Sequence, residues 1–128
     1  MEAAQRYLEA KERYPAGSEE WARVTAKAFD LMMVCAEVAK PEWWNDEGLK
    51  ALSARVMRAA PNDEFAYLMR AVALSGVGGT WEEMPRSAAE VRQAAAHYDR
   101  SAALSNAPAL KAARARNAGL CRNMAEAM

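Results

Sequence analysis

Apolar side chains recur every three or four residues along most of the chain, and proline or glycine interrupts this pattern at intervals. Such spacing is typical of amphipathic helices, because residues at these intervals share one face of a helix. No segment alternates strictly between apolar and polar residues, which is the pattern of a half-buried strand. The sequence therefore predicts an all-α protein with six helices, at about residues 2–14, 18–40, 46–60, 63–75, 87–105 and 108–127.

Residues suited to helix capping stand at several of the predicted helix starts. Ser18 can accept a hydrogen bond from the first turn that follows it, and the acidic pair at 46–47 suits the positive end of a helix dipole. The segment 87–90 has the spacing of a capping box, and 80–83 has the same spacing, which predicts a single helical turn there. Pro108 fits the first turn of a helix, where its missing N–H costs nothing.

The predicted helices recur in pairs with a period of 45 or 46 residues. Equivalent positions are Pro15, Pro61 and Asn106; Trp21, Tyr67 and Ala112; and Tyr7, Ser53 and Tyr98. A fixed period with helix–turn–helix content predicts a solenoid, in which each helix pair buries its apolar face against the next pair. The sequence leaves one alternative open, an ordinary six-helix bundle in which the phasing is accidental.

The run Ala3, Tyr7, Ala10, Pro15 and Trp21 resembles the tetratricopeptide pattern of small and aromatic residues before a proline, with an aromatic residue in the next helix. The pattern returns at Pro61, Tyr67, Ala71, Leu74, Ala94, Tyr98 and Ser101. The resemblance implies a right-handed α–α superhelix of stacked antiparallel helix hairpins, a helical-repeat domain spanning residues 1–128. The period is longer than the family's repeat of about 34 residues. Thr25, Ser53 and Arg116 depart from the family's pattern.

Composition agrees with a helical protein and argues against several classes of partner. Alanine fills 31 positions and isoleucine is absent, a balance that favours helix. Seventeen basic residues balance 17 acidic ones, so net charge gives no bias toward polyanions. The longest apolar run is too short to span a bilayer, and the N-terminus lacks the apolar core of a signal peptide. We expect no membrane association, a cytoplasmic location, and free thiols at Cys35 and Cys121.

No residue pattern points to catalysis, a metal or a cofactor. His97 is the only histidine, and no Ser, Cys or Asp at helical spacing makes an obvious catalytic partner for it. Two distant cysteines and one histidine cannot supply clustered metal ligands. The glycine-rich segment 76–80 lacks the lysine of a phosphate-binding loop and follows a helix instead of a strand. We therefore expect a non-enzymatic protein without cofactor, and a surface or half-buried histidine.

The tetratricopeptide resemblance implies a partner-binding surface on the inner helices, at 18–40, 63–75 and 108–127. Projected onto this sequence, that surface comprises Arg23, Ala26, Phe29, Asp30, Phe65, Leu68, Met69, Val72, Leu110, Arg114, Asn117 and Leu120. Because most of these side chains are apolar, a peptide or helix with an apolar face is the expected partner, and the protein is expected to act as an interaction or scaffold module. The alternative is that these residues simply pack against one another.

Two other functions stay open. The segment 2–14 lacks a preceding mate, and Tyr7, Leu8 and Tyr14 are available to pack against a second copy or a longer parent chain, which predicts a self-assembling subunit. The charge is −4 over residues 1–85 and +4 over 86–128, which also suits head-to-tail contact. Lys111, Arg114 and Arg122 fall roughly on one face of 108–127, which suggests nucleic-acid binding, although a solvated face explains them more simply.

Overall fold

The helices predicted from the sequence are all present. The computed structural model describes residues 2–35 and 39–128, and these residues form six helices and no strand. The helices are α1 (Glu2–Lys11), α2 (Glu19–Val34), α3 (Asp46–Ala59), α4 (Glu64–Ser75), α5 (Ala88–Leu104) and α6 (Pro108–Ala127). The all-α prediction is therefore confirmed over the described part of the chain.

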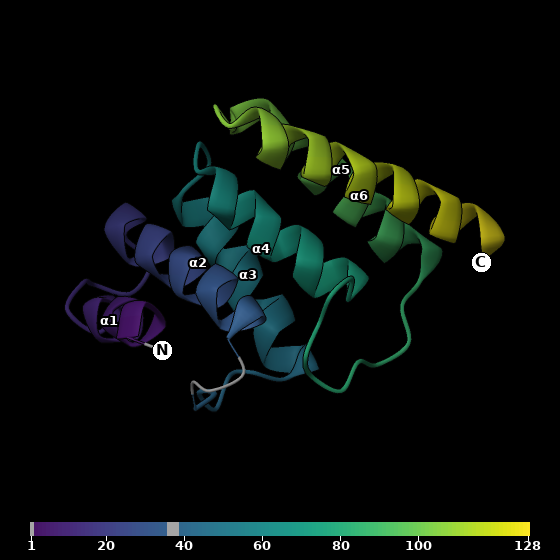
Figure 1. Ribbon diagram of the computed structural model, residues 1–128. Helices are drawn as coiled ribbons and strands as arrows, with labels where there is room; N and C mark the ends of the chain where they lie inside the picture. Colours follow the sequence, from purple (N-terminus) through teal and green to yellow (C-terminus); the bar gives the residue numbers. More distant parts are fainter. Residues whose placement is uncertain (1, 36–38) are drawn as a thin grey trace.

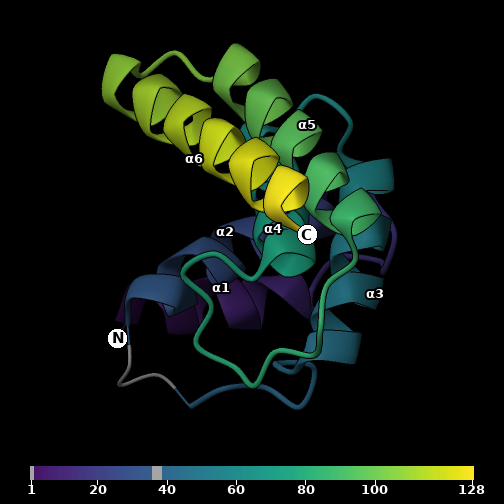
Figure 2. The ribbon, with the colours of Figure 1, turned by 90° about the vertical axis from the view of Figure 1, so that its right-hand side faces the viewer.

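The helices form two layers. Each helix packs against the next one in the sequence, and α2 also packs against α4. In Figure 1, α2, α4 and α6 lie nearer the viewer and α3 and α5 lie behind them. Figure 2, turned by 90°, shows α2 and α6 on one side and α3 and α5 on the other, with α4 between. The right-handed superhelix that the tetratricopeptide resemblance implies stays a prediction.

Small side chains allow this close packing. The core combines large residues such as Phe29, Met69 and Tyr98 with many fully buried alanines, and these alanines include Ala22, Ala26, Ala66, Ala73, Ala94 and Ala118. An alanine between two helices lets their backbones approach until the larger neighbours fill the remaining space.

The repeat-equivalent residue in α1 is less buried than the equivalent residues in α3 and α5. Ser53 and Tyr98 are fully buried, whereas Tyr7 is only partly buried. The main contact of α1 is with α2. There Ala4 joins Ala28 and Met32 in a small core of its own. The first helix therefore has less cover than its counterparts α3 and α5.

The first two helices end earlier than the sequence predicts. The helix α1 ends at Lys11 and not at Tyr14, because the N–H groups of Glu12 and Arg13 bond to carbonyls only three residues back. A tighter last turn of this kind is common at helix ends, and Pro15 disfavours helical backbone at the residue before it.

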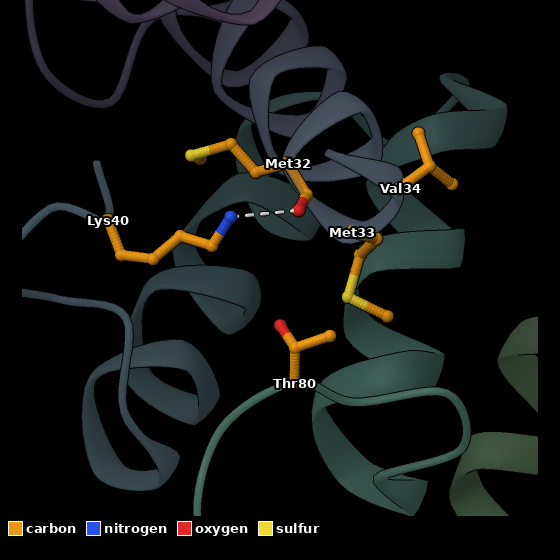
Figure 3. A pocket seen from close by; sticks show the side chains of 5 residues that line it. All are labelled: Met32, Met33, Val34, Lys40 and Thr80. Carbon is orange, nitrogen blue, oxygen red and sulfur yellow. Dashed lines mark hydrogen bonds between the residues drawn. The ribbon is translucent and has the colours of Figure 1, made fainter. Parts of the chain in front are cut away.

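The helix α2 ends at Val34 and not at Lys40. Cys35 has extended backbone, with φ −123° and ψ 104°. Lys40 Nζ donates to the carbonyl oxygens of Met32 (3.1 Å) and Cys35 (2.8 Å). Figure 3 shows its ammonium directed at Met32 O. A side chain from beyond the helix thus satisfies carbonyls that further helical residues would otherwise bond. Residues 36–38 of the predicted helix lie outside the described residues.

The segment 76–87 does not contain the helical turn predicted at 80–83. Two long-range contacts fix it instead. Trp81 Nε1 donates to Asp46 Oδ1 (3.1 Å), and the Arg86 guanidinium donates to Asp46 Oδ1 (2.5 Å) and Oδ2 (3.0 Å). The Trp81 ring also packs edge-on against Trp44, with centroids 6.0 Å apart. These contacts join the segment to the start of α3 and explain its extended path in Figure 2.

Three of the local predictions at helix starts are confirmed. Ser18 accepts from the N–H of Trp21, and Ser87 and Glu90 form the complete capping box at the start of α5. Pro108 occupies the first turn of α6.

Replacing Asp46 with asparagine tests the anchor of the 76–87 segment. Burial alone would raise the pKa of Asp46, but hydrogen bonds from Arg86 and Trp81 outweigh it and lower the pKa from 3.8 to about 2. A depressed carboxyl pKa stabilises the fold above the unfolded value, and this stability is lost as the pH falls through the folded value. We expect Asp46→Asn to lower the free energy of unfolding by about 2 kcal/mol at pH 7.

Urea unfolding between pH 7 and pH 2 measures this effect. The difference between wild type and Asp46→Asn should shrink as the pH falls from about 4 toward 2. Glu47→Gln is the matched control, since Glu47 is exposed in the same helical turn. An equal loss in the control, or a difference independent of pH, would contradict the anchor.

Candidate functional site

The predicted partner-binding residues divide into buried and accessible groups. Phe29 and Met69 are 1% and 0% exposed, and Val72 is 7% exposed. These three side chains belong to the core, so their prediction as partner contacts is wrong for the folded chain. The reason is that α2 and α4 pack directly on each other, and the apolar positions facing this contact are filled by it. Ala26 is fully buried for the same reason.

Arg114 is also buried, at 3% exposure. Its Nη1 donates to Glu64 Oε1 at 2.7 Å and to the carbonyl of Ser101 at 3.4 Å. The guanidinium therefore joins α6 to α4 and α5, and it is not free to bind a partner. This corrects its prediction as a binding residue.

The basic stripe predicted on α6 is used inside the chain. Besides the Arg114 contacts, Lys111 Nζ donates to Ala102 O at 2.9 Å, and Arg122 pairs with Asp99. Both of these contacts reach α5. The stripe is therefore not an array of unpaired cations, which removes its main argument as a phosphate-binding surface.

The remaining predicted residues stay accessible. Phe65, Leu68 and Asn117 are partly exposed, Leu110 is 41% exposed, and Leu120 is 47% exposed. Arg23 is exposed and pairs with Glu19 of its own helix at 2.7 Å. Lys111 and Arg122 contact α5 from one side of the buried stripe of α6. Helical spacing places Asn117 and Leu120 on the opposite side of that stripe. We use the name α2–α4–α6 face for the surface formed by seven residues, Arg23, Lys27, Asp30, Phe65, Leu68, Asn117 and Leu120.

Phe65 of α4 has cations from both α2 and α6 beside its ring. Lys27 Nζ from α2 lies 3.8 Å from the Phe65 ring centroid, and Arg114 Cζ from α6 lies 5.3 Å from it. Cations are attracted to the electron-rich face of an aromatic ring, so this ring connects the three helices. Lys27 was not among the residues predicted for this surface. Its spacing of four residues from Arg23 and three from Asp30 was the pattern that could have placed it on this face.

Asp30 is a carboxylate of the α2–α4–α6 face with an unusual electrostatic environment. Its side chain is partly buried and has no hydrogen bond or ion pair with any residue that the structure describes. Burial raises the pKa of the carboxyl, and the cations Lys27 and Arg114 offset this only in part. A partly desolvated carboxylate without a donor is unfavourable in the isolated chain.

A pocket lies at the end of α2. Met32, Met33, Val34, Lys40 and Thr80 line a pocket of about 320 Å³, and Figure 3 shows the Thr80 hydroxyl directed toward the space beside Lys40. The Lys40 ammonium already bonds to the carbonyls that end α2. This lysine therefore has a structural role in ending the helix.

The chain has one histidine, His97, and two cysteines, Cys35 and Cys121. His97 is half-buried with its ring 6.0 Å from that of Tyr67, and burial together with Arg70 lowers its pKa. Cys35 and Cys121 are both free thiols, as predicted, and burial raises the pKa of Cys121. An activated thiol needs a lowered pKa or an adjacent base, and the raised pKa of Cys121 is the opposite of the first condition.

No three His, Cys, Asp or Glu side chains in residues 2–35 and 39–128 lie together as metal ligands could. No helix in the same residues combines the length and apolar character needed to cross a bilayer.

Comparisons with protein-family models, with curated proteins and with solved structures gave no match for this chain. The tetratricopeptide resemblance is therefore carried by the residues of the sequence alone.

Replacing Asp30 with asparagine tests whether its charged carboxylate destabilises the fold. Because the folded pKa is raised, the carboxyl group stabilises the fold at low pH, and this stability is lost as the pH rises through the folded value. We expect Asp30→Asn to raise the free energy of unfolding at pH 7 by roughly 0.5 kcal/mol. Chemical unfolding at pH 7 and at pH 3 measures the gain, which should be absent at pH 3. Destabilisation at pH 7 would show that Asp30 has a partner inside the chain.

Proposed function

We propose that the protein is a non-enzymatic interaction module that binds a peptide or helix on the α2–α4–α6 face. The partner supplies an apolar side chain to the surface around Phe65 and Leu120, and a basic side chain to Asp30. This proposal agrees with the function that the tetratricopeptide resemblance implies.

The observation that carries the proposal is the unpaired Asp30 carboxylate beside accessible apolar groups. Residues that reduce stability are retained where binding requires them. A lysine or arginine of a partner would donate to Asp30 and remove the cost of its partial burial. Within the chain, Lys27 is held over the Phe65 ring and Arg114 is paired with Glu64.

The apolar part of the α2–α4–α6 face supports the same proposal. Phe65 and Leu68 are partly exposed, and Leu120 is 47% exposed. Apolar side chains surrounded by charged ones are typical of protein-interaction sites, which have an apolar centre and a polar rim. Arg23, paired with Glu19, contributes to that rim.

Matched substitutions of exposed apolar residues test the binding surface. Leu120→Asp places a charge on the α2–α4–α6 face, and Met84→Asp does so at a 60% exposed residue in the 76–87 segment. We expect a partner purified with the wild-type chain to bind Leu120→Asp at least about tenfold more weakly, because a desolvated charge would be buried. Calorimetric titration measures the affinities, and circular dichroism checks that both variants keep their helices. Equal affinity of the two variants would rule out this surface.

Asp30→Asn separates binding from stability. The variant is expected to be at least as stable as the wild type, yet to bind the partner several-fold more weakly, because the charge-assisted contact is lost. A variant that gains stability and keeps full affinity would eliminate the basic contact while leaving the apolar surface in place.

A self-assembling subunit is the second proposal, supported by the incomplete cover of α1. Ala3, Tyr7, Ala10 and Val24 help to line an open pocket of about 360 Å³ between α1 and α2. A second copy that fills this pocket would bury the exposed side of the first helix.

Sedimentation over a concentration series tests self-assembly. If α1 mediates it, the wild-type chain associates as its concentration rises, and Ala10→Glu remains monomeric because a carboxylate enters the pocket. A wild-type chain that is monomeric at every concentration would reject this proposal.

A further inference from the structure

Two adjoining pockets lie where the end of α1, the start of α2 and the face of α3 meet. Lys11, Trp21, Trp43, Leu52 and Arg55 are among the residues that line the larger one, of about 320 Å³. Gly17, Arg55, Arg58 and Ala59 line the smaller one, of about 240 Å³. Because Arg55 lines both pockets, the two lie next to each other, and none of their lining residues belongs to the α2–α4–α6 face.

The linings of these pockets carry three cations and no carboxylate. Lys11, Arg55 and Arg58 form no ion pair or hydrogen bond within the part of the chain that the structure describes. Five other cations in the described residues, Arg23, Lys50, Arg86, Arg114 and Arg122, pair with carboxylates. Burial lowers the pKa of nearby Arg70, and the positive charge of Arg58 lowers it further.

The Trp21 ring holds two of these cations in position. Lys11 Nζ lies 5.5 Å and Arg55 Cζ lies 4.9 Å from the Trp21 ring, which is 3% exposed. These contacts reduce the freedom of two long side chains before any ligand arrives, which lowers the entropic cost of binding. Arg58 follows Arg55 by one helical turn, so the two guanidinium groups project from the same side of α3.

Trp43 supplies an accessible flat surface in the larger pocket. It is partly exposed, and its ring packs against Trp44 with centroids 5.9 Å apart. Gly48 allows the Trp43 backbone to lie close to α3, since a Cβ at this position would be 2.5 Å from the Trp43 carbonyl oxygen. The indole is therefore held at the pocket by its own backbone and by the neighbouring ring.

We propose that this double pocket binds a small organic phosphate with a flat ring, of the size of a nucleoside monophosphate. The ring packs against Trp43 in the larger pocket, and the phosphate is bound by Arg55 and Arg58 at the smaller one, with Lys11 adding a third positive charge. Guanidinium groups match phosphate oxygens in charge and geometry, and indoles stack on flat rings. The larger pocket has the volume typical of small-molecule sites.

Titration of the full chain with adenosine monophosphate tests the proposal, using calorimetry in a phosphate-free buffer of low ionic strength. We expect saturable binding with a dissociation constant below about 1 mM. Adenosine and inorganic phosphate should each bind at least about tenfold more weakly, because each makes only half of the contacts.

Three substitutions locate the binding. Arg55→Gln should weaken binding of the nucleotide roughly tenfold or more, through loss of a charge-assisted contact. Trp43→Leu should lower nucleotide affinity to that of inorganic phosphate. Arg92→Gln is the matched control, because Arg92 is an exposed arginine of α5 away from both pockets, and it should bind as the wild type does.

Four results would overturn the proposal. They are the absence of saturable nucleotide binding, equal losses in Arg55→Gln and Arg92→Gln, equal affinity for the nucleotide and inorganic phosphate, and tighter Arg55-dependent binding of a single-stranded oligonucleotide. The third result would indicate simple anion attraction, and the fourth would indicate a polymer as the ligand.

Discussion

A partly buried ion pair between α6 and α4 is the interaction on which the rest of the structure depends. Arg114 reaches inward from α6 to the Glu64 carboxylate and the Ser101 carbonyl, at 3% exposure. Most of the packing of α6 is against α5, so this pair is the main polar link that sets the distance of α6 from α4. A buried guanidinium without its carboxylate is strongly unfavourable, and α6 must therefore remain where Glu64 can reach it.

The same constraint shapes the α2–α4–α6 face. Arg114 lies beside the Phe65 ring from one helix and Lys27 lies over it from another, so the aromatic residue is held between cations. Close packing of alanine-rich helices draws Phe29 and Met69 into the core and leaves Asp30 at the surface without a donor. A surface expected to be mainly apolar is thus apolar at its centre and charged around it.

Local features were predictable from the sequence, whereas long-range contacts were not. Ser18, the Ser87–Glu90 capping box and Pro108 act within one helical turn, and their roles follow from spacing alone. The end of α2 depends on Lys40 folding back onto carbonyls, and the 76–87 segment depends on Asp46, 40 residues before Arg86. No short spacing reveals such pairs.

The candidate site was predictable in part for the same reason. Helical spacing placed Arg114 on the correct side of α6, but spacing does not reveal how deeply a side chain is buried. Its partner Glu64 lies 50 residues away in the sequence. Phe65, Leu68 and Asn117 remained accessible as expected. Lys11 comes from α1 and Arg55 and Arg58 come from α3, so only the folded chain brings these three cations together.

A double-mutant cycle on the free energy of unfolding tests most directly whether the Arg114–Glu64 pair positions α6. The cycle compares wild type, Arg114→Met, Glu64→Gln and the double variant by urea unfolding at pH 7. The account predicts a coupling energy of at least about 1 kcal/mol between the two sites, as found for residues in direct contact. Additive effects of the two substitutions, with no coupling beyond error, would contradict it.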